Sequence, residues 1–277
     1  MSFLKITAAA TRAAFTFAAL AAVLFATTGC CNHPAAGSQW TLRLSNNVSL
    51  EMLPVAAGSF TMGSPSSEPS EAQHRVRITR SYWLGKYEVT QAQWQAVMGS
   101  APSYFEGAQH PVESVTWNDA MEFCAKLTNQ ERAAGRLPTG YRYTLPTEAQ
   151  WEYACRAGTT GSYGGSGNLN EMGWHAANSG DKTHDVGGKS PNAWGFYDMH
   201  GNVWEWCSDW YDSYCYPSGS VSDPTGPNSG SDRVLRGGSW HYDSGCCRSA
   251  YRLYFSPSLR NIGGMGFRVA LAPASVR

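Results

Sequence analysis

Apolar and polar residues alternate along three stretches in the first third of the chain. Residues 50–55, 58–63 and 74–79 have a period of two, and the last of them places Val76 and Ile78 opposite Arg75 and Arg77. Successive side chains of a strand point to opposite faces, so each stretch predicts a strand with one buried face.

Three later segments have a period of three to four instead, which predicts helices with one apolar face. Their apolar sets are Trp94, Val97 and Met98; Ala120, Phe123 and Leu127; and Trp151 and Cys155. Thr90 and Thr147 precede the first and third helices and can cap their free N–H groups. The second helix spans about residues 119–134, with either Thr116 or Asn118 as its cap.

Residues 159–189 have no period and are rich in Gly, Asn and Ser, which predicts a long loop. His175, His184 and Asp185 lie in this loop, and their spacing does not match that of a zinc site. The chain contains 29 Gly and 14 Pro, and only 15% of its residues are charged. Together with the strands and helices, this composition predicts a single loop-rich α+β domain over residues 46–273.

The N-terminus predicts export and lipid attachment. Lys5 and Arg12 precede an apolar run at residues 13–26, and the segment ends in Thr-Thr-Gly-Cys at residues 27–30. This pattern resembles a bacterial lipoprotein signal, although Thr27 stands where Leu is usual. Residues 1–29 are then a signal peptide, Cys30 is the lipidated residue, and residues 30–45 are a tether. An ordinary signal peptide and a retained anchor are the alternatives.

The charge balance argues against a nucleic-acid partner. The whole chain has 21 basic and 21 acidic residues. Removal of residues 1–29 takes away Lys5 and Arg12 and leaves a net charge of about −2, which offers no basic footprint for nucleic acid.

The cysteines fit an exported protein but do not define a disulfide framework. Besides Cys30 there are seven: Cys31, Cys124, Cys155, Cys207, Cys215, Cys246 and Cys247. They cannot all pair within one chain, so at least one free thiol is expected. Cys124 and Cys155 lie on the inner faces of predicted helices, which favours packed apolar side chains over a bridge.

Four blocks in the last third of the chain share a content of Gly, Trp and Arg between them, at residues 195–206, 236–240, 247–252 and 266–270. Together they resemble the formylglycine-generating enzyme (sulfatase-modifying factor) family. The resemblance implies a C-type lectin-like fold of that enzyme subclass. A fold does not fix an activity, so the site is considered separately.

Two pairs of residues decide whether the family's oxidase chemistry is expected. The resemblance places a copper-binding cysteine pair three and eight residues after Ser239, where this chain has Tyr242 and Cys247. A tyrosine supplies no thiolate, so we expect no copper and no catalysis. Glu148 and Glu152, one turn apart on a predicted helix, are expected to pair with arginines rather than act as an acid and base.

The residues between these blocks indicate a different use of the fold. They are His241, Tyr242, Asp243, Ser244, Gly245, Cys246, Leu253, Tyr254, Phe255, Ser256, Ser258, Leu259, Asn261, Ile262 and Gly263. Each can arise from an AAC or AAT codon whose adenines have been replaced. In this respect the chain resembles variable proteins of diversity-generating retroelements, of the treponemal variable protein type. Most amino-acid types satisfy the same codon rule, so a chance run is the alternative.

These variable positions suit a binding face over about residues 240–264. Their tyrosines, Phe255 and Leu259 offer contact area at low entropy cost, and the Ser and Asp residues offer adaptable hydrogen bonds. We expect a monomeric lipoprotein, exposed on the outer membrane, that binds an unidentified protein or glycan on another cell. A formylglycine-generating or related oxidase acting on a peptidyl cysteine and a structural envelope lipoprotein are the alternatives.

The resemblance also implies one calcium ion at the block that begins at residue 195. Its ligands carry over as the side chains of Asp198 and Glu205 and the carbonyls of Gly201 and Val203. Oxygen donors of this kind are those that calcium prefers. The alternative is that Glu205 pairs with Arg236 or Arg268.

Overall fold

The computed structural model describes residue 1 and residues 37–65, 69–214, 219–260 and 263–274. The predicted signal peptide after Met1, Cys30, Cys31, Cys215, Asn261 and Ile262 lie outside these residues. Within the described part of the chain, no helix is long and apolar enough to cross a membrane.

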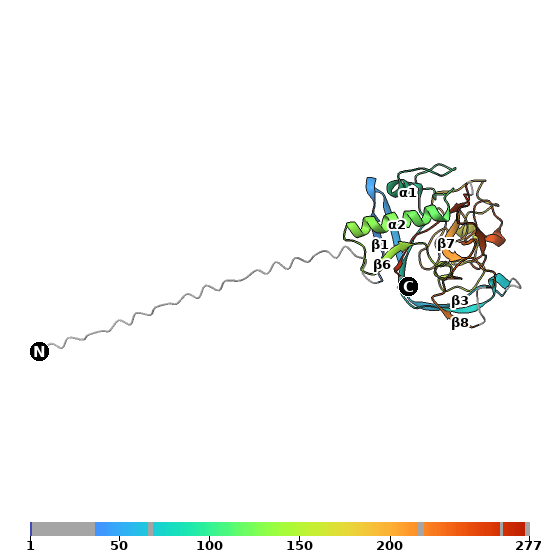
Figure 1. Cartoon of the computed structure of the whole chain (residues 1–277), viewed down its shortest axis with the longest axis horizontal. Coiled ribbons are helices and arrows are strands. Elements are labelled where there is room, and N and C mark those ends of the chain that lie inside the picture. The colour runs from blue at the N-terminus through green and yellow to red at the C-terminus, as the bar shows by residue number, and fades with distance from the viewer. Residues whose placement is uncertain (2–36, 66–68, 215–218, 261–262, 275–277) are drawn as a thin grey trace. The chain divides into compact units, whose positions relative to one another are not determined.

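A five-stranded antiparallel sheet joins the two ends of the domain (Figure 1). Its strands, in spatial order, are β1 (Trp40–Arg43), β2 (Ser49–Val55), β5 (Tyr82–Gly85), β12 (Ala270–Pro273) and β6 (Tyr141–Thr144). β12 lies between β5 and β6, so the last strand of the chain closes the sheet that the first strands began. β1 pairs with β2, and the domain therefore includes residues that the sequence assigned to the tether.

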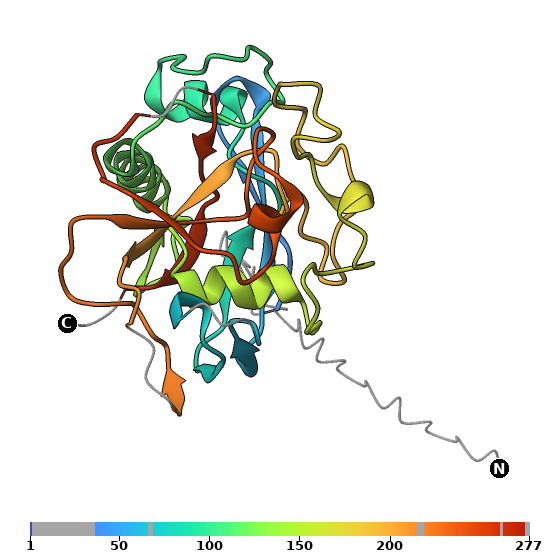
Figure 2. The same cartoon turned by 90° about the vertical axis from the view of Figure 1, so that its right-hand side faces the viewer.

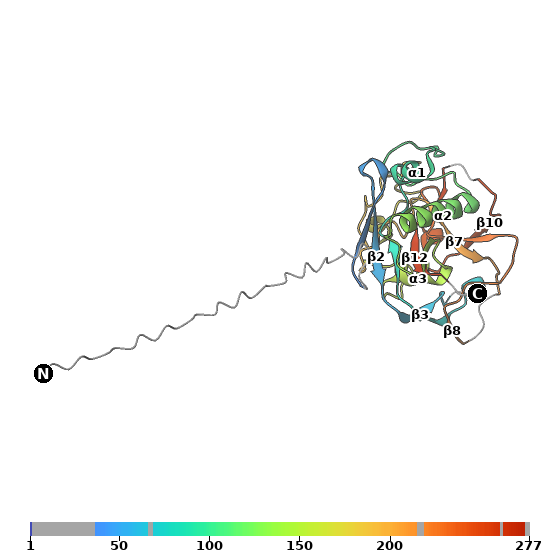
Figure 3. The same cartoon turned by 60° about the vertical axis from the view of Figure 1, so that its left-hand side comes forward.

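Two smaller sheets complete the fold. One contains β10 (Leu253–Phe255), β9 (Arg233–Arg236), β7 (Trp204–Trp210) and β11 (Met265–Gly266), with β10 at its edge (Figure 3). The other contains β3 (Gly58–Met62), β4 (His74–Ile78) and β8 (Ser220–Ser222). Val76 and Ile78 are buried and Arg75 and Arg77 are exposed, which confirms the predicted period of two.

The three predicted helices are present, with the predicted caps. They are α1 (Gln91–Met98), α2 (Trp117–Ala133) and α3 (Glu148–Arg156), and each begins with a complete capping box. The cap of α2 is Thr116 and not Asn118, so this helix starts two residues earlier than predicted. A short helix, α4 (Leu169–Met172), lies in the segment predicted to be only loop, because a single turn capped by Asn168 is too short to leave a period.

The core consists of two apolar clusters, which lie on opposite faces of the five-stranded sheet. In the first, Trp94 of α1 stacks on Phe123 of α2 with ring centroids 5.7 Å apart, and Phe267 packs edge-on against both. α2 also packs on β6, while α3 contacts β3, β7 and β9. The helices and sheets together confirm the predicted α+β class.

Candidate functional site

The predicted variable region begins after β9 and ends at β11, and it crosses the face turned toward the viewer in Figure 2. Among its described members, the exposed residues are His241, Asp243, Ser244, Tyr254, Ser258 and Leu259. Those of intermediate exposure are Tyr242, Gly245, Cys246, Leu253, Phe255 and Ser256. We call these twelve residues the variable face.

The residues interspersed with the variable face are mostly buried. Cys247, Ser249, Ala250 and Arg252 lie between its segments, and each is less than a tenth exposed. The chain therefore passes repeatedly between surface and interior over a short distance. A substitution at an exposed position changes the surface without disturbing the packing beneath it.

The first segment of the variable face is residues 241–246, and it ends within the short 3-10 helix η3 (Ser244–Cys247). Arg248 fixes this segment. Its guanidinium donates two parallel hydrogen bonds to Glu71, of 2.7 and 2.8 Å. Burial raises the pKa of Glu71, but the hydrogen bonds from Arg248 and Ser64 outweigh it and leave that pKa below its usual value. Sequence reasoning missed this pair, because nothing local links residues that lie 177 positions apart.

The second segment of the variable face begins on β10 (Leu253–Phe255). It is held by a network of ion pairs between arginines and glutamates. Arg252 donates to Glu148, and Arg236 forms ion pairs with both Glu148 and Glu152. Arg156 pairs with the other oxygen of Glu152 at 2.8 Å. This network confirms that the two glutamates are structural partners of arginines.

Gly263 differs from the other described members of the predicted variable set, because it is buried. Its N–H donates to the carboxylate of Glu113 at 3.0 Å, and its carbonyl accepts from the indole of Trp240. Its φ of 78° favours glycine, and a Cβ would lie 3.0 Å from the ring of Phe105. Gly263 therefore ends the variable region but offers no side chain to a ligand, which the codon rule could not reveal.

The two positions of the family's cysteine pair lack the properties of a thiolate site. The ring of Tyr242 packs edge-on against Trp204, with centroids 5.3 Å apart. Cys247 is fully buried, and burial raises the pKa of its thiol to about 12. A Cβ on Gly238 would lie 2.5 Å from the sulfur of Cys247, which shows how tightly this thiol is enclosed.

The other described cysteines are also free thiols. Cys124, Cys155 and Cys207 are buried, and Cys246 has intermediate exposure. Burial raises the pKa of Cys124 above its ordinary value and that of Cys155 to about 12. The prediction that Cys124 and Cys155 pack as apolar residues is confirmed.

Two of the expected calcium ligands, Asp198 and Glu205, belong to a buried cluster of charged side chains. Both oxygens of Glu205 accept hydrogen bonds from Arg268, and Oε2 also accepts from the indole of Trp151. The predicted alternative, an ion pair between Glu205 and Arg268, is therefore present. Asp198 accepts from the N–H of Gly187 with Oδ2, while its buried Oδ1 has no hydrogen-bond partner.

A third carboxyl group, that of Glu88, lies in the same cluster. Glu88 accepts from the N–H of Val203 at 3.0 Å and from the side chain of Asn202 at 2.7 Å. Burial, followed by the charges of Asp198 and Glu205, raises the pKa of Glu88 well above its ordinary value. Burial also raises the pKa of Asp198 to about 6. Arg268 forms its ion pair with Glu205, and Oδ1 of Asp198 is left without a hydrogen-bond partner.

The histidines of residues 159–189 do not converge on a metal. His184 stacks on Trp174 with ring centroids 3.7 Å apart, and His175 contacts the side chain of Asn170. Asp185 instead faces His110 at 3.6 Å. In the described parts of the chain, no group of three or more His, Cys, Asp or Glu residues could hold a metal ion.

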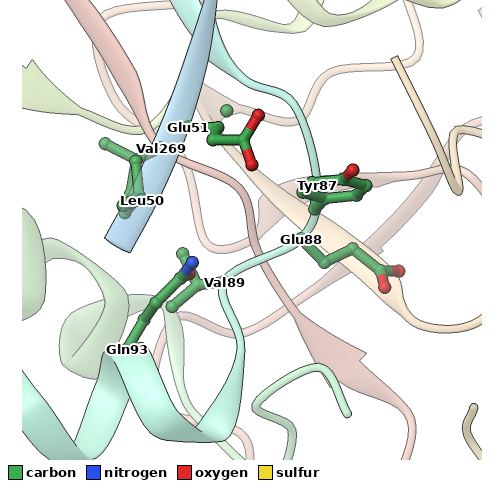
Figure 4. Close-up of a pocket in the computed structure, with 8 residues that line it drawn as sticks. Leu50, Glu51, Tyr87, Glu88, Val89, Gln93 and Val269 are labelled. Atoms are coloured by element: carbon green, nitrogen blue, oxygen red, sulfur yellow. The ribbon is translucent and has the colours of Figure 1, made fainter. Parts of the chain in front are cut away.

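A small pocket lies away from the variable face, between β2 and the segment that follows β5 (Figure 4). Leu50, Glu51, Tyr87, Gln93 and Val269 are among its lining residues. Glu51 pairs with Lys86 at 3.1 Å, and Gln93 donates to the carbonyl of Ser49. The polar groups at this pocket thus have partners within the protein.

Comparison with known proteins places this geometry in a family. The model of the sulfatase-modifying factor enzyme 1-like domain matches residues 43–273. The chaperone protein LppX of Paenibacillus barcinonensis is 32% identical over 243 residues, which cover 71% of this chain and 80% of that protein. The formylglycine-generating enzyme of Mus musculus is 34% identical over 215 residues, covering 71% of this chain and 53% of the enzyme. The chain thus spans about half of that enzyme's length.

A solved structure is similar over almost its whole length. Variable protein 1 of Treponema denticola aligns with a TM-score of 0.76 and 34% identity, covering 84% of this chain and 98% of that chain. The predicted C-type lectin-like fold of the formylglycine-generating enzyme subclass is therefore confirmed. The chain belongs to the family of the sulfatase-modifying factor enzyme 1-like domain, and its structure resembles that of a variable protein.

Proposed function

We propose that this protein is a surface-displayed lipoprotein that binds a ligand through the variable face, on a scaffold that does not catalyse a reaction. The observation that carries the proposal is that surface positions and buried positions are interspersed within residues 240–264. The residues of the variable face are exposed or half-buried, whereas Cys247, Ser249 and Arg252 between them are buried. A scaffold built in this way tolerates many different surfaces.

The similarity to variable protein 1 of Treponema denticola supports this proposal over an enzymatic one. Formylglycine-generating enzymes are also relatives, so the family alone does not decide between the two. Tyr242 and the enclosed thiol of Cys247 favour the binding protein, because an oxidase of this family needs two accessible cysteines at these positions.

Retroelement diversification explains why the variable face has its composition. Its Tyr, Phe, Leu, Ser and Asp residues are all reachable from asparagine codons by adenine replacement. The ligand is an unidentified protein or glycan, because loops drawn from a randomised pool keep no family record of their partner. The lipid anchor at Cys30 then holds the face at the membrane surface.

The DNA next to the gene tests this proposal directly. We expect a near-identical repeat of the segment encoding the variable face, with adenines at the codons of the twelve residues, and a reverse transcriptase gene nearby. Sister copies of the gene should differ at these codons and agree at those of Arg248, Ser249 and Arg252. A segment without a template repeat, with changes spread evenly over buried and exposed codons, would contradict diversification.

A further inference from the structure

The loop that follows α1 carries an exposed tyrosine that the variable region does not include. In the described part of the domain, the large apolar side chains that are exposed are Tyr104, Tyr214, Tyr254 and Leu259. Tyr254 and Leu259 belong to the variable face. Tyr104 is 67% exposed and comes from a segment more than a hundred residues earlier in the chain.

A row of aromatic rings connects Tyr104 to the variable face. Tyr104 packs edge-on against Phe105, with centroids 4.9 Å apart, and Phe105 packs edge-on against Trp240 at 5.2 Å. Trp240 in turn contacts the ring of His241, the first residue of the variable face, at 4.9 Å. In Figure 2 the loop after α1 runs beside the red segment that ends the variable region.

Glu113 holds this loop and the end of the variable region together. One carboxylate oxygen accepts hydrogen bonds from the N–H groups of Tyr104 and Phe105, at 2.6 and 2.8 Å. The other accepts from the N–H of Gly263 at 3.0 Å and from the hydroxyl of Ser114 at 2.6 Å. Glu113 is fully buried, so these bonds form in a medium where they are strong. The backbone at Tyr104 is therefore fixed in place relative to the variable region.

The ring of Tyr104 indicates the kind of partner. It is exposed, and the backbone that carries it is held by Glu113. Exposed aromatic side chains on rigid backbones are typical contact residues for protein partners. The surface around Tyr104 and the variable face thus suits a protein.

We infer that Tyr104 is a constant contact residue beside the variable face and that the joint surface binds a folded protein. This inference rests on the proposed function. Variation then changes which protein is recognised, while Tyr104 supplies the same contact area to every clone. Its ring loses little conformational freedom on binding, because the loop beneath it is already fixed.

A display experiment tests this inference. The full chain is displayed with the twelve residues of the variable face randomised, and clones are selected separately on immobilised lysozyme and on an immobilised mannose oligosaccharide. Several independent lysozyme binders then receive Tyr104→Ala, Tyr104→Phe or Tyr214→Ala. Tyr214 is the control for an exposed tyrosine, because it is 79% exposed and is not one of the twelve residues of the variable face. Dissociation constants and melting temperatures are measured for each variant.

We expect binders to lysozyme and none to the oligosaccharide. Tyr104→Ala should weaken most binders at least about tenfold, as for a central interface residue, while Tyr104→Phe and Tyr214→Ala stay within about twofold. Melting temperatures should not change, because the Tyr104 side chain is exposed. Binders that are indifferent to Tyr104→Ala, or binders to the oligosaccharide alone, overturn this inference and leave the proposed function standing. A library without binders to either probe overturns the proposed function itself.

Discussion

Arg252 and Glu148 form a buried bidentate ion pair, in which Nε donates to Oε1 at 2.6 Å and Nη2 donates to Oε2 at 2.8 Å. Arg252 immediately precedes β10 and Glu148 is the first residue of α3, 104 positions earlier. The pair thus attaches the second segment of the variable face to the scaffold. It lies beneath residues that are proposed to vary, so every variant depends on it.

Removal of one partner should therefore be costly. Glu148→Gln leaves Arg252 without its buried counter-charge and leaves Arg236 with Glu152 alone, and we expect a loss of about 3–5 kcal/mol in the free energy of unfolding. Urea denaturation measures this loss. Glu122→Gln is the control, because Glu122 forms an exposed pair with Lys126 on α2 and should cost about 0.5 kcal/mol or less. Equal losses in the two variants would show that the buried pair has no special role.

Local features of the fold were predictable from the sequence, and contacts between distant segments were not. The threonines that cap α1 and α3 act within four residues, so the pattern at Thr90 and Thr147 was sufficient. The pairing of Glu148 and Glu152 with arginines was also expected, but not which arginines. Glu113 left no signal, because it acts on the backbone of Gly263, which is 150 positions away.

In the candidate site, too, local features were predictable from the sequence and contacts between distant segments were not. Of the thirteen described positions that the codon rule selected, twelve are exposed or half-buried. Gly263 passed the rule only because glycine is among the encoded types, and its positive φ is a property of the folded backbone. Tyr104 has no codon signal and joins the surface through tertiary contacts alone.

Asp209 should make the stability of the protein depend on pH. Burial, and then the charge of Glu148, raises the pKa of this carboxyl from 3.8 to about 7. The folded state thus keeps a proton that the unfolded state releases, so this contribution is present at low pH and is lost as the pH rises toward 7. Asp209→Asn cannot lose that proton and can still accept from the N–H of Glu148.

Unfolding in urea between pH 4 and 7 tests this prediction. Relative to the unmodified protein, the stability of Asp209→Asn should increase with pH by up to about 1.4 kcal/mol per pH unit. Asp232→Asn is a suitable control, because Asp232 is only partly buried on a loop and its one side-chain bond is to neighbouring Ser231. Parallel curves for Asp209→Asn and the unmodified protein would mean that Asp209 is ionised throughout this range.

The protein should not convert cysteine to formylglycine. We expect no aldehyde, by mass spectrometry, when the purified protein is incubated with copper, oxygen and a sulfatase-type cysteine peptide. Tyr242→Cys should also be inactive, because Cys247 remains enclosed against Gly238. The formylglycine-generating enzyme of Streptomyces coelicolor serves as the positive control. Product above the level of the protein-free reaction would refute the non-catalytic scaffold.

Cys30 should anchor the protein in the membrane. Lipidation there is expected to add several acyl chains, whereas a single chain gives only marginal attachment. Cys30→Ser should therefore move the protein from the membrane fraction to the soluble fraction in cell fractionation. Cys31→Ser is the matched control and should stay in the membrane fraction. Retention of Cys30→Ser would instead indicate a protein anchor.

Calcium should stabilise the folded protein through Asp198. The buried Oδ1 of Asp198 has no hydrogen-bond partner, and the nearby Arg268 forms its ion pair with Glu205. At a free calcium concentration of about one hundred times Kd, the gain is about 2.7 kcal/mol, or roughly 5–10 °C in melting temperature. A chelator should reverse this gain.

The control for this prediction must separate the loss of calcium binding from the change in backbone strain that a substitution of Asp198 causes. Asp198 has a φ of 56°, so Asp198→Ala destabilises the protein even without a metal. The informative quantity is therefore the difference between melting temperatures with calcium and with chelator, measured for each variant. This difference should be large in the unmodified protein and close to zero in Asp198→Ala. If it is zero in both, calcium does not bind at Asp198, and the cluster is held without a metal by bonds such as the ion pair between Glu205 and Arg268.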